Sequence, residues 1–164
     1  LSARVGYALG WAHDPSRYLR YSADVRRYVD LFRGDRVLVL RTRVLGVVGE
    51  DDAIPFDSLP YLGGRVFLRG YPSQRFRDRL SFMGSAEYQY PINHYLSGYL
   101  FTDAGRVFRD YSAVELAGLR VGFGGGLDYR SVAGTIARLS LSSSIDGGIY
   151  FNFGFEAVPD VHTR

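Results

Sequence analysis

The sequence has no cysteine and no long apolar run. Its 164 residues therefore form no disulfide framework, cysteine-based zinc finger or thiol nucleophile, and the lack of cysteine is compatible with an oxidising compartment. No run approaches the ~20 apolar residues of a membrane-spanning helix, which excludes a helical membrane protein but not a membrane barrel. The net charge of +3 is too small to indicate a nucleic-acid partner. The chain begins at Leu1 with neither Met nor a signal-peptide pattern, which predicts a mature or trimmed product.

Catalytic and metal-binding patterns are missing as well. The sequence contains no G-x-S-x-G nucleophile motif, and His13, His94 and His162 are isolated, without the spacing of metal ligands. The glycine-rich run at 122–128 is not followed by a Lys-Ser/Thr pair, which argues against a nucleotide-binding loop. We therefore expect no enzymatic activity, no metal site and no cofactor.

The sequence is rich in aromatic residues and glycine, and its side chains alternate. Aromatic residues make up 15% of the chain, and there are 20 glycines. Apolar and polar residues alternate with the period of a β-strand in a series of segments. These segments are 1–12, 17–32, 36–48, 80–90, 119–129, 134–144 and 147–155, and 95–108 also indicates a strand, although its two faces are less distinct. The pattern predicts an all-β antiparallel fold whose strands approach the ~9–11 residues needed to cross a bilayer.

The two faces of these predicted strands differ in polarity. One face carries Leu, Val, Phe and Tyr, with Arg27 as an interruption. The other face carries Arg20, Arg26, Arg41, Arg43, Glu87, Arg120, Asp128 and Arg138. A dry core cannot hold so many charges, because an unpaired buried charge is too costly. The pattern favours a transmembrane β-barrel with a polar lumen over the alternative, a soluble β-protein, and it treats residues 1–164 as one domain.

Residues 51–79 form a long predicted loop between two strands. Its apolar and aromatic content is too high for a solvated tail, so we expect it to fold back against the protein, into the polar lumen. Arg69 would then need a carboxylate, and Glu87 and Asp103 are candidates on the next two strands, with Asp103 near the end of its strand. The alternative is a surface turn at residues 69–71, with Arg75, Arg77 and Arg79 as solvated charges.

Several motifs resemble those of the outer-membrane protein assembly factor superfamily. This group contains BamA- and TamA-like proteins, surface-antigen-type barrels, two-partner secretion transporters and barrels fused to patatin-like domains. The matching motifs are Leu68-Arg69-Gly70-Tyr71 after Gly63-Gly64, the strand Ala86–Ile92, the set Phe101, Asp103, Gly105 and Val107, the glycine-rich strand Arg120–Leu127, and a closing strand that ends at Phe155. The resemblance covers residues 36–156.

The resemblance implies an integral protein of the outer membrane of a Gram-negative bacterium. It implies that 51–79 is an extracellular loop and that Arg69 pairs with Glu87 and Asp103, with Gly70 allowing a tight turn and Tyr71 packing beside it. The implied function is insertion, assembly or translocation of proteins; the alternative is a short family member with a structural or lipid-interacting role. The implied partners are outer-membrane lipids or lipopolysaccharide, with unfolded outer-membrane proteins or a second barrel copy as further candidates.

The number of strands leaves two architectures open. The eight predicted strands form either a small closed barrel or the C-terminal half of a sixteen-stranded one. In a small barrel the loop would be crowded, and Arg69 would bind nearer the rim. If the chain is complete, the closing strand, with Phe151, Phe153 and Phe155, is expected to pair with residues 1–12. The residues predicted to face lipid are Leu1, Val5, Leu9, Leu38, Leu40, Phe151 and Phe153.

Overall fold

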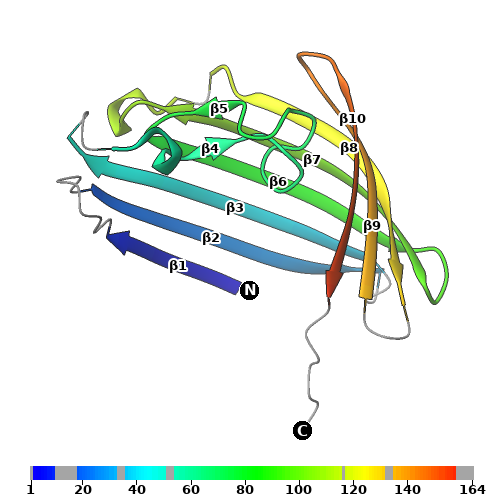
Figure 1. Cartoon of the computed structure of the whole chain (residues 1–164). Coiled ribbons are helices and arrows are strands. Elements are labelled where there is room, and N and C mark those ends of the chain that lie inside the picture. Colours follow the sequence, from blue (N-terminus) through cyan, green and yellow to red (C-terminus); the bar gives the residue numbers. More distant parts are fainter. Residues whose placement is uncertain are drawn as a thin grey trace, which may run out of the picture.

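The chain folds into one curled antiparallel sheet. The computed structural model describes residues 2–9, 18–32, 36–50, 54–115, 117–131 and 135–157. The sheet has eight strands that follow one another in chain order (Figure 1). The strands are β1 (Ser2–Leu9), β2 (Tyr18–Leu31), β3 (Arg36–Gly49), β6 (Leu80–Pro91), β7 (Leu96–Phe108), β8 (Arg120–Arg130), β9 (Thr135–Ser144) and β10 (Ile149–Ala157). The prediction of an all-β antiparallel fold is confirmed, and each strand of the eight-stranded sheet falls on a segment that the sequence predicted as a strand.

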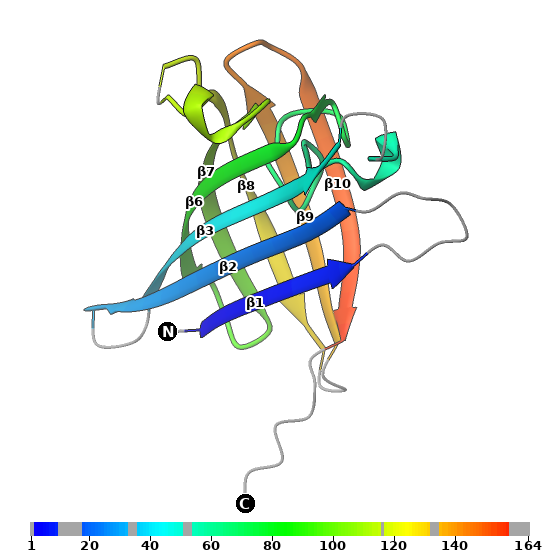
Figure 2. The same cartoon turned by 90° about the vertical axis from the view of Figure 1, so that its left-hand side faces the viewer.

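The sheet curls without closing. Figure 2 shows β1 to β3 along one side of the hollow and β9 and β10 across it. In the described residues, β1 pairs only with β2, and β10 pairs only with β9. The expected pairing between the closing strand and residues 1–12 is therefore not seen, and each edge strand has one side without a partner strand. Such edges carry rows of backbone donors and acceptors that another strand can use.

Two details differ from the sequence prediction. The strands β2 and β3 each contain 14 residues, so they continue beyond the length that a bilayer alone requires. Asp103 lies near the middle of β7 and not near its end, because β7 continues to Phe108. The short helical turns η2 (Phe56–Ser58) and η3 (Tyr111–Ala113) accompany the strands. No helix in the described ranges is long and apolar enough to cross a membrane.

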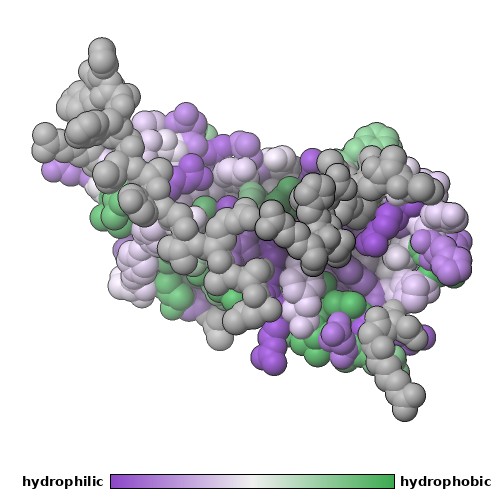
Figure 3. All heavy atoms as spheres, turned by 90° about the horizontal axis from the view of Figure 1, so that it is seen from below, coloured by the Kyte–Doolittle hydropathy of each residue, from purple (hydrophilic) through white to green (hydrophobic). Residues whose placement is uncertain are grey.

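The two faces of the sheet have opposite polarity, as the alternation predicts. The convex face is lined by exposed apolar side chains, and Arg27 interrupts it. These exposed residues include Leu19, Val25, Leu40, Leu100, Phe123, Leu127, Leu139, Leu141, Phe151, Phe153 and Phe155. Figure 3, viewed from below, shows hydrophilic residues in the middle of the molecule and hydrophobic residues beside them. Leu1 and the side chains of Val5 and Leu9 lie outside what the structure describes.

The described part of the long loop, from residue 54 onward, lies against the concave face (Figure 1). It contains a small two-stranded sheet, β4 (Tyr61–Leu62) paired with β5 (Phe76–Arg77), which the sequence analysis did not predict. The pair is held by packing, because two residues are too few to form a stable strand alone. The loop and the sheet share a small hydrophobic core of Leu62, Leu68, Tyr71 and Met83, with Phe67, Phe76 and Val107 packed against it.

The polarity of the faces can be tested with nitroxide labels, since the chain has no native cysteine. Neighbouring residues on one strand form matched pairs: Phe153 with Asn152 on β10, and Leu40 with Val39 on β3. With the protein in liposomes, the relaxation of labels at Phe153 and Leu40 is expected to be accelerated by lipid-soluble oxygen, because the convex face is expected to meet lipid. The relaxation of labels at Asn152 and Val39 is expected to be accelerated by a water-soluble nickel complex. The reverse pattern, or no difference within the pairs, would contradict the assignment of faces.

Candidate functional site: the arginine anchor of the long loop

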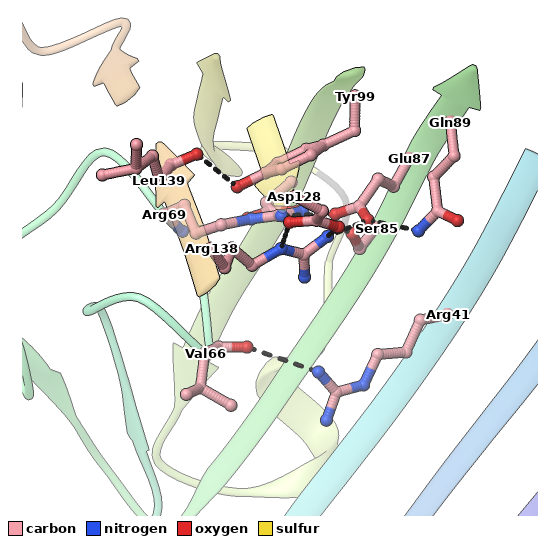
Figure 4. Close-up of polar contacts among 11 residues, drawn as sticks. Arg41, Val66, Arg69, Ser85, Glu87, Gln89, Tyr99, Asp128, Arg138 and Leu139 are labelled. Atoms are coloured by element: carbon pink, nitrogen blue, oxygen red, sulfur yellow. Dashed lines mark hydrogen bonds and ion pairs between the residues drawn. The ribbon is translucent and has the colours of Figure 1, made fainter. Parts of the chain in front are cut away.

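Arg69 extends from the loop into the concave face and contacts two strands (Figure 4). Its Nε and Nη2 donate to Oδ2 and Oδ1 of Asp103 on β7, each at 2.8 Å. Its Nη1 donates to Oε2 of Glu87 on β6 at 2.6 Å. The backbone N–H of Arg69 also donates to Asp103 Oδ2, at 2.9 Å. The paired bonds to Asp103 have the fork geometry that makes arginine–carboxylate contacts strong and directional.

Neighbouring polar groups hold the two carboxylates in place. Ser85, directly opposite Asp103 in the β6–β7 pair, donates from Oγ to Asp103 Oδ1 at 2.7 Å. The same hydroxyl accepts from Arg69 Nη2 at 3.2 Å. Gln89 donates to Glu87 Oε1 at 2.8 Å. Each carboxylate is therefore held by a residue of the sheet as well as by Arg69.

A second guanidinium extends the cluster to β8 and β9. Arg138 on β9 donates from Nη2 to Glu87 Oε1 at 2.7 Å. Its Nε donates to Oδ1 of Asp128, the directly opposite residue on β8, at 2.9 Å. Four successive strands, β6 to β9, thus each contribute a charged residue to one network. We call Arg69, Glu87, Asp103, Asp128 and Arg138 the anchor cluster.

Aromatic rings lie under both guanidinium groups. The Cζ of Arg69 is 3.5 Å from the ring centroid of Phe101, and the Cζ of Arg138 is 4.2 Å from that of Tyr99. Both rings come from β7, and the Tyr99 hydroxyl donates to the Leu139 carbonyl at 3.1 Å. A cation above an aromatic face gains electrostatic attraction, and the gain is larger where water is displaced.

Three members of the anchor cluster are shielded from solvent, whereas Asp128 and Arg138 are partly exposed. The side chains of Arg69, Glu87 and Asp103 are 12%, 10% and 2% exposed. Burial alone lowers the pKa of the Arg69 guanidinium, but the bonds to Asp103 and the charge of Glu87 raise it above its ordinary value. Arg69 therefore stays charged. Ion pairs at this depth are stable only when the remaining lone pairs and protons find partners, and the network supplies them.

The backbone around Arg69 fits closely against the sheet. Leu68 and Gly70 have positive φ angles of 58° and 92°. A side chain at Gly70 would overlap the Ser143 carbonyl of β9, so glycine is required there for two reasons. Gly122 of β8 has the complementary role, because a Cβ at this position would overlap the carbonyl of Arg69. Tyr71 is buried beside this contact, and its hydroxyl donates to the Val121 carbonyl at 3.4 Å.

The residues that the sequence analysis grouped fall into two places. Arg69, Gly70, Tyr71, Glu87 and Asp103 meet on the concave face. The closing-strand residues Phe151, Phe153 and Phe155 are exposed on the opposite face of β10, away from the anchor cluster.

Sequence reasoning missed several contributors to this arrangement. They are Ser85, Phe101, Gly122 and the Arg138–Asp128 pair. All of them except Phe101 were on predicted polar faces, but only the strand register places them around Arg69.

No metal site occurs within the ranges that the structure describes. No group of three or more His, Asp or Glu side chains there could hold a metal ion. His94 lies in the turn between β6 and β7, and His13 and His162 lie outside the described residues. The arrangement binds a segment of its own chain, and its chemistry is that of a structural clamp.

A loop arginine clamped to the polar face of a curled antiparallel sheet, with an apolar face outside, defines a barrel-type β-protein with an inserted loop. The Omp85 superfamily domain matches residues 1–156. The chain therefore belongs to the Omp85 superfamily, whose members are outer-membrane β-barrel proteins of protein assembly and transport. No curated protein matches the chain.

A solved structure shares the fold. The chain is similar to BamA from Haemophilus ducreyi, in a crystal structure lacking POTRA domains 1–3, with a TM-score of 0.75 and 17% sequence identity. The match covers 92% of this chain and 37% of that chain. The chain thus spans little more than a third of the length of this relative.

Replacing Arg69 with alanine tests the clamp. The change leaves Asp103 and Glu87 buried without their main cation, which typically costs about 3–5 kcal/mol. The loop is expected to become sensitive to protease while the sheet remains folded. Lysine at position 69 is expected to restore resistance only in part, because it lacks the planar fork. Arg75, exposed in the same loop, provides the control Arg75→Ala. Equal digestion rates for Arg69→Ala, Arg75→Ala and the parent would show that Arg69 does not hold the loop.

The fit at Gly122 can be tested separately from charge. Gly122→Ala places a methyl group against the Arg69 carbonyl, and overpacking of this kind typically costs about 1–3 kcal/mol. We expect the alanine variant to lose loop protection, measured by hydrogen exchange at residues 62–71. Gly84→Ala is the matched control, because a Cβ at Gly84 has no neighbour within 4 Å. If both alanine variants protect the loop equally well, the close approach at Gly122 has no energetic importance.

Proposed function

We propose that the chain is an integral outer-membrane β-barrel unit of BamA/TamA type that takes part in inserting, assembling or translocating other proteins. The observation that carries the proposal is the anchor cluster, in which the loop motif at 68–71 is clamped to carboxylates on β6 and β7 in a chain of this superfamily. A loop serving only to connect two strands does not require such a network.

The proposed setting follows from the polarity of the two faces. The convex face would meet the hydrocarbon region of the outer membrane of a Gram-negative bacterium, because its exposed apolar residues form a continuous series along the strands. The concave face would line the lumen. The loop at 51–79 would lie at the extracellular end, within reach of lipid and lipopolysaccharide headgroups.

The edge strands provide the proposed mode of action. Each of β1 and β10 has one side without a partner strand among the described residues. In a bilayer such an edge is costly, because its backbone groups find no water. An unfolded outer-membrane protein could satisfy the edge by adding a strand to it, as in other cases of strand addition. A second barrel copy could satisfy it equally, which would correspond to the structural alternative without insertase activity.

Reconstitution tests the proposal directly. The protein in proteoliposomes is expected to accelerate folding of a urea-denatured outer-membrane barrel substrate, followed by the gel shift of the folded form, relative to empty liposomes. Arg69→Ala is expected to reduce the acceleration, whereas Arg75→Ala in the same loop is expected to retain it.

The outcome separates the two functional classes. If folding is no faster than in empty liposomes, and cysteines introduced in β1 and β10 crosslink between two copies, the structural role replaces the proposed one. If only a chain extended by preceding segments is active, the described unit is a part of the machinery.

A further inference from the structure

The concave face contains a second charged cluster outside the anchor. Asp24 on β2 accepts from Nε and Nη2 of Arg41 on β3, at 3.0 and 2.6 Å. Arg26 approaches the same carboxylate at 3.5 Å and Arg43 at 4.0 Å. Asp24 is the only carboxylate within 4.0 Å of these three arginines among the described residues. We call Asp24, Arg26, Arg41 and Arg43 the basic cluster.

The strand register worsens this imbalance of charge. Arg26 and Arg41 are directly opposite each other in the β2–β3 pair. Like charges in this position repel each other and destabilise the pair of strands. Within the described part of the chain, the Nε of Arg43 is buried without a hydrogen-bond partner. The anchor cluster has the opposite composition, with more carboxylates than guanidinium groups.

The loop contacts the basic cluster and adds a further cation, Arg65. Arg41 donates from Nη1 to the Val66 carbonyl at 3.3 Å, and the ring centroid of Phe67 lies 4.1 Å from the Cζ of Arg43. These contacts hold the loop tip over the basic cluster. Arg65 is exposed at this tip and reaches toward β10, where a Cβ on Gly154 would touch its Nη1.

A cavity of about 320 Å³ lies between these groups. Its lining includes Arg26, Arg41 and Arg65 together with the anchor residues Arg69, Glu87, Asp103 and Arg138. Figure 4 shows the space between Arg41, with Val66, and the anchor cluster. The Arg26 side chain is 44% exposed, so part of its guanidinium is open to the cavity.

We propose that this cavity binds a small phosphate-class oxyanion between Arg26, Arg41 and Arg65. The three guanidinium groups come from β2, β3 and the loop and line the same cavity, where their N–H groups could serve several oxygens of one tetrahedral anion. Arginine is well suited to such anions, because its fork of N–H donors matches pairs of oxygens. The anion relieves the repulsion between Arg26 and Arg41 and links the loop tip to the wall. This property goes beyond protein assembly and does not depend on it.

Inorganic phosphate is the probe for the first test. The full chain in neutral detergent is titrated by calorimetry at constant ionic strength, with chloride as the replacement ion. Saturable binding is expected, and Arg26→Gln and Arg65→Gln are each expected to weaken it by about tenfold or more, as loss of a hydrogen bond to a charged group implies. Arg27→Gln is the matched control, because Arg27 is the next residue on β2 and belongs to the opposite face.

The other outcomes overturn the proposal. Non-saturable heat, or equal affinity in the parent and all three variants, would mean that phosphate meets only general surface charge. A second arm uses nanodiscs with and without phosphatidic acid. If the arginine-dependent signal requires the anionic lipid and free phosphate gives none, the ligand is a headgroup at the membrane and the cavity is not a solute site. If the loop of Arg26→Gln resists protease as well as the loop of the parent, the variant is folded.

Discussion

A guanidinium held between two carboxylates on adjacent strands is the constraint around which the concave face is organised. Asp103 and Glu87 are buried on β7 and β6, so their charges need a cationic partner. Arg69 supplies that charge from the loop, so the position of the loop and the charge balance of the sheet are set by one interaction. The positive φ angle at Leu68, which is unusual for a leucine, is held by the surrounding contacts. Arg138 then links the same carboxylate, Glu87, to β9.

The fold satisfies opposite demands on the two sides of one sheet. Glycine on the concave side makes room for aromatic rings: a Cβ at Gly126 would overlap the Tyr99 ring, and one at Gly124 would overlap that of Phe101. The guanidinium groups of Arg69 and Arg138 lie over these rings, so the glycine-rich strand β8 indirectly positions the two charges. On the convex side, β9 and β10 present Leu139, Leu141 and the phenylalanines at 151, 153 and 155 outward. An exposed apolar face of this kind marks a surface that interacts with a membrane or with another protein.

The sequence predicted the features that depend on neighbouring residues, and it did not predict those that depend on strand register or tertiary packing. The sequence pattern identified all eight strands, and alternation assigned two faces to every one except 95–108, because side-chain direction follows directly from strand geometry. Motif resemblance grouped Arg69 with Glu87 and Asp103, and these side chains lie together. The Arg138–Asp128 pair was not predicted, because it depends on the register between β8 and β9. The two-residue strands β4 and β5 were not predicted either, since tertiary packing holds them and intrinsic preference does not. Whether the sheet closes depends on what meets its edges, and a periodic pattern carries no information about that.

The contact between Arg69 and Asp103 has a polarity that a simple ion pair lacks. Asp103 accepts bonds from the guanidinium, from the backbone N–H of residue 69 and from the Ser85 hydroxyl. A carboxylate is the only charged group that can accept all of these bonds, because a guanidinium has donors alone. Exchanging the two residues would therefore conserve net charge and still leave the backbone N–H of residue 69 facing a donor. Exchanging the acidic and the basic residue is therefore not equivalent to the native arrangement. A second substitution that restores only the net charge does not restore the hydrogen bonds of the clamp.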